Sequence, residues 1–148
     1  MNNEKLKESL IQNEGIKQYV YTCPKGYKTI GVGRNLETKG LSKAEIMYLL
    51  ENDILDCKLF LEDIFKDFHS LSDARQNVLI EMVFNLGNGG FNQFKKLIQA
   101  IKEKDFIKAS EEMLNSKWHN DFINFRQDKN EKQTRSYKLS QIIKKGEF

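Results

Sequence analysis

The feature that most constrains the fold is a change of residue pattern at Ser42. Ser42 begins the sequence S-K-A-E, in which Glu45 stands three residues after the cap, an arrangement known as a capping box. Apolar residues then recur at helical spacing. They are Ile46, Leu49, Leu50, Ile54, Cys57, Leu61 and Ile64. This pattern predicts one long amphipathic helix over residues 42–65.

Helical spacing continues through the C-terminal two thirds of the chain. One run is apolar on nearly all sides and ends at G-N-G-G, so it predicts a helix inside a bundle. Its apolar members are Val78, Leu79, Met82, Val83 and Leu86. Further apolar stripes predict helices at 91–101, 106–114 and 131–144, separated by short polar breaks. We therefore expect residues 66–148 to form an all-helical lobe.

The N-terminal part begins with a helix but then changes to a strand pattern. Leu6, Leu10 and Ile11 predict a helix over residues 3–13, which ends at Glu14-Gly15. Residues 16–32 are aromatic and β-branched and are interrupted by C-P-K-G, which is typical of a β-hairpin.

Together these patterns predict an α+β fold in a single domain, residues 1–148. A small lobe of helix plus hairpin, residues 14–41, is joined by the long helix to the helical lobe. The N-terminal helix is expected to pack on the helical lobe.

Composition excludes several classes of protein. The 148 residues are 39% hydrophobic and 30% charged, as in a globular protein that folds alone, and we expect a monomer. A net charge of +3 is too small for a typical nucleic-acid binder. A run of about 18 apolar residues, as membrane insertion requires, does not occur. Cys23 and Cys57 are expected to be free thiols, and His69 and His119 to be surface or helix-end residues, so neither a metal nor a cofactor is predicted.

The hairpin predicts a polar and aromatic face. If Pro24, Lys25 and Gly26 form a three-residue loop, Cys23 pairs with Tyr27 and Tyr21 faces Thr29. Alternation along the strands then gathers polar and aromatic side chains on one surface and leaves aliphatic ones on the other. The first set is Tyr19, Tyr21, Cys23, Tyr27 and Thr29, and the second is Val20, Ile30 and Val32. A two-residue loop would instead turn Thr29 away.

The spacing Glu14, eight residues, Cys23, five residues, Thr29 resembles the pattern of the phage-type lysozymes, where the central residue is Asp or Cys. The resemblance extends to "LSDARQNVLIEMVFNLGNGG", to "SKW" at 116–118 and to "TRSYKLSQIIKKG", and so covers nearly the whole chain. It implies a lysozyme-like fold. Because the segment 34–41 is short, the hairpin lobe is expected to contain no extra strand or helix.

The resemblance also implies a reaction and its residues. The family hydrolyses the β-1,4 bond between N-acetylmuramic acid and N-acetylglucosamine in peptidoglycan. It implies that Glu14 is the proton donor and Thr29 holds the attacking water, while Cys23 either acts as a thiolate base or only polarises the water. Arg135 would orient Glu14 in this scheme.

Other residues are expected to contact substrate. The polar face of the hairpin adds Tyr21, and the family's cleft implies Phe84 and Asn85 on the helical lobe. Phe84 could equally be a core residue, and Trp118 is expected to belong to the core.

Two other functions compete with this one. One is a wall amidase or peptidase that uses Cys23 as nucleophile together with His69 or His119, although such a thiol usually lies at a helix start. The other is a catalytically weak peptidoglycan-binding protein, which the missing Asp would favour. Because the N-terminus does not resemble a signal peptide, we expect the protein to be made in the host cytoplasm. The resemblance to the pore-dependent endolysins implies that it reaches the periplasm and cell wall through a separate holin-type pore and causes lysis.

Overall fold

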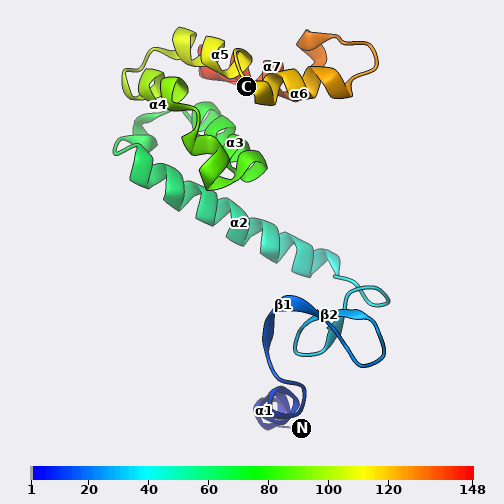
Figure 1. Cartoon of the computed structure of the whole chain (residues 1–148). Helices are drawn as coiled ribbons and strands as arrows, with labels where there is room; N and C mark the ends of the chain where they lie inside the picture. Colours follow the sequence, from blue (N-terminus) through cyan, green and yellow to red (C-terminus); the bar gives the residue numbers. More distant parts are fainter. Residues whose placement is uncertain (1) are drawn as a thin grey trace. The chain divides into compact units, whose positions relative to one another are not determined.

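The computed structural model describes residues 2–148, shown in Figure 1. The chain divides into two compact units, Met1–Leu50 and Glu51–Phe148. Helix α2 (Lys43–Ile64) contains the boundary between them, and it matches the long helix predicted from the sequence. The described residues form mainly helices with one small antiparallel sheet, which confirms the α+β class.

The first unit begins with helix α1 (Asn3–Glu14). The Asn2 side chain caps it by accepting from the Lys5 N–H at 3.1 Å, and Gly15 ends it with a φ of 74°. Strands β1 (Lys17–Thr22), β2 (Lys28–Gly31) and β3 (Arg34–Asn35) follow in the sheet order β1-β2-β3.

Strand β3 corrects the expectation of a hairpin without an extra strand. Thr29 pairs with Asn35 and Ile30 with Arg34. Gly31 and Gly33 have φ values of 66° and 67°, which permits the chain to reverse sharply between β2 and β3. Two residues are too short a strand to show alternation in the sequence.

The register of the hairpin is the predicted one. Tyr21 lies opposite Thr29, and the Cys23 N–H donates to the Tyr27 carbonyl at 2.9 Å. Gly26 takes the left-handed position of the three-residue loop, with a φ of 88°. An irregularity between Lys17 and Tyr21 interrupts the alternation farther along β1, where Tyr19 is exposed.

The second unit is helical. After the rest of α2 come a short 3-10 turn (Phe68–Ser70), α3 (Asp73–Asn92), α4 (Lys95–Lys102), α5 (Phe106–Leu114), α6 (Lys117–Phe125), a second 3-10 turn (Glu131–Gln133) and α7 (Arg135–Lys145). Their apolar faces enclose one core, whose fully buried members include Leu61, Leu79, Met82, Phe91, Met113 and Ile143.

Several helix boundaries differ from the prediction. Gly87, with a φ of 70°, breaks α3 as expected, but helical structure resumes and runs to Asn92, so α4 begins only at Lys95. Helix α6 was not predicted; Ser116 caps it by accepting from the His119 N–H at 3.1 Å. The predicted helix at 131–144 begins at Arg135, after a separate turn.

Candidate functional site

Cys23 and Thr29 lie together near the loop end of the hairpin. Thr29 is only 3% exposed, and its hydroxyl donates to the Tyr27 carbonyl at 3.0 Å. The Cys23 sulfur is partly exposed, and the backbone N–H of Tyr27 lowers the pKa of its thiol most, with smaller contributions from Lys25, the Thr29 hydroxyl and Gly26. Tyr21, half-buried, is the cross-strand partner of Thr29. This end of the sheet can therefore stabilise a thiolate beside a fixed hydroxyl.

Glu14 is the last residue of α1, and its carboxylate lies against Gly33. A Cβ atom added to Gly33 would stand 3.2 Å from Oε2 of Glu14, so the missing side chain leaves room for the carboxylate. Glu14 is exposed. Because a glycosidase proton donor requires partial burial, the role of Glu14 stays a prediction.

The remaining predicted residues belong to the helical unit. Arg135 begins α7, and its Nε donates to Oε1 of Glu81 on α3 at 2.5 Å. The Asn85 side chain accepts from Trp118 Nε1 at 2.7 Å, which leaves the Asn85 amide hydrogens to donate elsewhere. Phe84, which could have been a core residue, is 48% exposed. The orientation of Glu14 by Arg135 stays a prediction.

Trp118 packs in the core, as expected. Its ring meets those of Phe94 and Phe122 edge to face, at centroid distances of 6.2 and 5.3 Å. The pairing with Asn85 satisfies the indole N–H, which a buried Trp requires.

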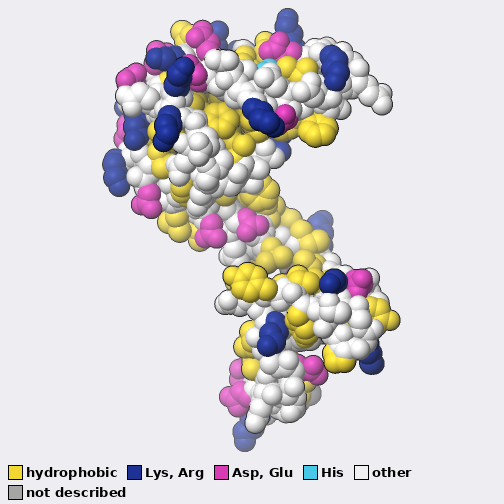
Figure 2. Space-filling view, in the orientation of Figure 1, with side chains coloured by type: hydrophobic (Ala, Val, Ile, Leu, Met, Phe, Trp, Pro, Cys, Tyr) yellow, Lys and Arg dark blue, Asp and Glu magenta, His cyan; other side chains and the backbone are white. Residues whose placement is uncertain are grey.

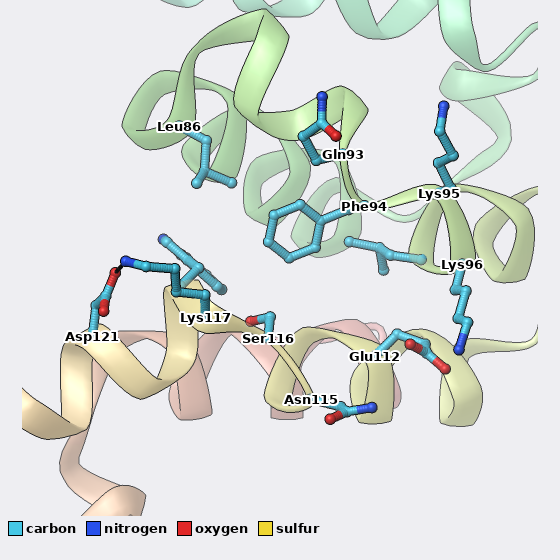
Figure 3. A pocket seen from close by; sticks show the side chains of 12 residues that line it. Leu86, Gln93, Phe94, Lys95, Lys96, Glu112, Asn115, Ser116, Lys117 and Asp121 are labelled. Carbon is cyan, nitrogen blue, oxygen red and sulfur yellow. Dashed lines mark hydrogen bonds and ion pairs between the residues drawn. The ribbon is translucent and has the colours of Figure 1, made fainter.

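The sequence did not predict a pocket of about 670 Å³ beside Trp118. Figure 3 shows the Phe94 ring within it, with Lys95 and Lys96 to one side and the ion pair between Lys117 and Asp121 to the other. That ion pair is 2.6 Å long. The sequence signal that could have indicated the pocket is the aromatic residue of "NQF" and of "SKW", each adjacent to lysine. The pocket combines an aromatic wall with lysines and with the carboxylates of Glu112 and Asp121, which suits a ligand that carries both apolar and charged or polar groups.

The two histidines differ from each other in environment. His69 is exposed and lies 2.9 Å from Glu62. His119 is buried, with only 2% of its surface exposed, and it lies in the first turn of α6, so of the two expected alternatives it is a helix-end residue and not a surface one. Its Nδ1 lies 2.6 Å from Ser136 Oγ and its Nε2 lies 3.0 Å from Glu131 Oε1. Because both ring nitrogens are already bonded, His119 is poorly suited to activate a cysteine nucleophile.

Residues 2–148 lack the features of two other classes of site. His, Cys, Asp and Glu side chains nowhere form a cluster of metal-binding type among these residues. Within the same part of the chain, every helix is too short or too polar to cross a bilayer. On the face drawn in Figure 2, lysine and arginine side chains are spread over the surface and do not gather in one patch.

The small antiparallel sheet, the long helix α2 and the helical unit are those of the lysozyme-like α+β class. Residues 11–133 match the family model described as phage lysozyme. The chain belongs to the phage lysozyme family.

Individual relatives agree with this assignment. Probable T4-type lysozyme 2 of Dictyostelium discoideum is 30% identical, over 77% of this chain and 84% of the relative. Probable T4-type lysozyme 1 of the same organism is 27% identical over the same shares. The pre-baseplate central spike protein Gp5 of Enterobacteria phage T4 is 26% identical, over 79% of this chain but only 25% of the relative.

Proposed function

We propose that this protein is a muramidase that hydrolyses the β-1,4 bond between N-acetylmuramic acid and N-acetylglucosamine in peptidoglycan. The observation that carries the proposal is the hairpin register, in which Tyr21 faces Thr29 and the Thr29 hydroxyl lies beside the Cys23 sulfur. Glycoside hydrolysis needs a proton for the leaving oxygen and a group that positions or activates water. Glu14 supplies the proton, and Thr29 with Cys23 holds the water.

The helical unit supplies substrate contacts in this proposal. The Asn85 amide donates to the wall polymer, and the exposed Phe84 packs against it. Trp118 links Asn85 to the pocket, because it bonds the amide oxygen and also lines the pocket wall. Arg135 orients the Glu14 carboxylate.

The biological setting follows from the resemblance to pore-dependent endolysins. We propose that the protein acts as a monomer on the peptidoglycan of the host, for lysis. A separate holin-type pore would release it from the host cytoplasm to the periplasm and wall.

The chemical group released from purified peptidoglycan tests the proposal. A muramidase generates new reducing sugar ends, an amidase that uses Cys23 would release free amines, and a wall-binding protein would release neither. The thiol in place of a carboxylate is the one observation that favours the wall-binding protein. Glu14→Gln should abolish the release of reducing ends, whereas Glu8→Gln, on the same helix, should retain it. Release of amines, or release of reducing ends by Glu14→Gln at the wild-type rate, would refute the proposal.

A further inference from the structure

His119 joins three segments of the helical unit through two hydrogen bonds, a buried one to Ser136 and a partly buried one to the half-exposed Glu131. It lies in the first turn of α6, while Glu131 belongs to the following 3-10 turn and Ser136 to the first turn of α7. Ser136 is fully buried, and its hydroxyl also lies 3.3 Å from Thr134 Oγ1. A buried polar network that is fully bonded fixes the position of every segment it connects.

The donors and acceptors at the His119 ring are matched in one tautomer, in which the single Ser136 hydroxyl proton points to Nδ1 and not to Thr134 Oγ1. When the imidazole is neutral with its proton on Nε2, it donates to the Glu131 carboxylate, and Nδ1 accepts from the Ser136 hydroxyl. Thr134 closes the network, because its hydroxyl donates to the Glu131 carbonyl at 2.6 Å and accepts from the Tyr137 N–H at 3.2 Å. Thr134 is the N-cap of α7, so the network holds this end of the helix.

Arg135 stands between two members of the network, Thr134 and Ser136. Its backbone is therefore held on both sides, and its guanidinium donates to Glu81 on α3. Side-chain direction depends on the position of the Cα atom, so a shift of the α7 terminus would move the guanidinium away from Glu81.

We propose that His119 is a positioning residue, which fixes the first turn of α7 and thereby the direction of the Arg135 side chain. The inference deepens the proposed function and rests on it, because Arg135 matters for the reaction only if it orients the proton donor. An aromatic ring without nitrogens at this position would fill the space but would leave Glu131 and Ser136 without their partner.

The test compares His119→Phe with Ile143→Val at a temperature where both variants are folded. Ile143→Val removes one buried methyl group from α7 and no polar group. Two measurements are made, the kcat and KM for release of reducing ends and the NMR signal of the Arg135 Nε–H. His119→Phe should lower kcat about tenfold with KM changed less than twofold, and it should shift the Arg135 signal. Ile143→Val should do neither, and His119→Asn, which keeps a polar atom toward Ser136, should recover part of the loss.

A double variant separates positioning from a general loss of order. In an Arg135→Lys background, His119→Phe should lower kcat by less than about twofold, since residues that act through one another are not additive. Full additivity, or an unmoved Arg135 signal in His119→Phe, would overturn the inference. If the wild type releases no reducing ends, the proposed function fails and with it the catalytic role of Arg135, while the NMR signal still decides whether His119 positions that side chain.

Discussion

Arg34 and Glu45 form a two-point ion pair that joins strand β3 to the first turn of α2. Nη1 of Arg34 lies 2.9 Å from Oε2 of Glu45, and Nη2 lies 2.5 Å from Oε1. Nη1 also donates to the Gly40 carbonyl at 3.1 Å, and Glu45 accepts from the Ser42 N–H at 2.7 Å. The capping box seen in the sequence is thus also the anchor of the loop between sheet and helix.

This pair should make the small unit sensitive to acid. Hydrogen bonding from Arg34, and then from Ser42, lowers the pKa of Glu45 from 4.5 to about 2. Because the pKa is lowered in the folded state, the stabilisation is complete above about pH 4.5 and is lost as the pH falls through about 2. The difference in thermal midpoint between wild type and Glu45→Gln should therefore be present at pH 6 and disappear near pH 2. Glu51→Gln, farther along α2, should show no such trend, and a Glu45→Gln difference independent of pH would contradict the prediction.

Gly33→Ala should impair activity more than Gly31→Ala. Both glycines have a positive φ, so each substitution should cost about 1–2 kcal/mol of backbone strain. Only the Cβ at position 33 would press on Glu14, at 3.2 Å from Oε2, whereas the one at position 31 meets open space. The free energy of unfolding should therefore fall by a similar amount in both variants. The rate of reducing-end release should fall further in Gly33→Ala than in Gly31→Ala. Equal activities in the two variants would show that contact with a Cβ at position 33 does not affect the function of the Glu14 carboxylate.

Cys23→Asp should remain active and should work at lower pH than the wild type. The Tyr27 N–H lowers the pKa of the Cys23 thiol, yet a carboxyl group with an ordinary pKa of about 4 ionises at still lower pH. If the Cys23 thiolate is the base, the acidic limb of the pH–rate profile moves down in Cys23→Asp. Cys23→Ser should lose about 10²–10⁴-fold in rate, and Cys57→Ala serves as control. An inactive Cys23→Asp would instead support a cysteine nucleophile.

Asn85→Asp should weaken substrate binding without weakening the fold. A carboxylate still accepts from Trp118 Nε1, but it cannot donate as the Asn85 amide does. KM for wall fragments should rise several-fold while the unfolding midpoint stays within a few degrees. Asn85→Leu, by contrast, should also cost about 1–3 kcal/mol because the indole N–H loses its acceptor. A KM unchanged in both variants would exclude Asn85 from the substrate contacts.

Arg75→Ala should destabilise the helical unit by about 1–3 kcal/mol. The Arg75 guanidinium donates to the carbonyls of Ile143 and Lys144 at 2.8 and 3.2 Å and stacks on the Phe106 ring at 3.5 Å. Arg75→Lys should recover only part of the loss, since an ammonium cannot make both bonds and stack. Urea unfolding measures the effect. Arg126→Ala, which removes a surface ion pair, should cost much less, and an equal cost at both positions would contradict this role of Arg75.

The sequence predicted the features that depend on neighbouring residues. The cap at Ser42, the loop at Pro24 to Gly26 and the pairing of Tyr21 with Thr29 are set by a few consecutive residues, and the structure has all of them. Strand β3 was not predicted because its two residues, Arg34 and Asn35, are too few to show the alternation of a strand.

The sequence could not predict features that depend on distant residues. His119 is buried because Glu131 and Ser136, 12 and 17 residues away, supply partners for its ring nitrogens. The pocket is lined by residues of α3, α4, α5 and α6, so no single segment of the sequence could indicate it. Helix α6 has only nine residues, which gives a weak periodic signal.

The two sulfur atoms differ in accessibility, so a thiol-reactive dye can distinguish Cys23 from Cys57 in the unmodified protein. Cys57 is enclosed in the core of the helical unit, whereas Cys23 faces solvent in part at the hairpin end. A maleimide dye should therefore attach at one place in the unmodified protein. Its fluorescence would then follow wall fragments as they arrive next to Thr29, with no engineered cysteine.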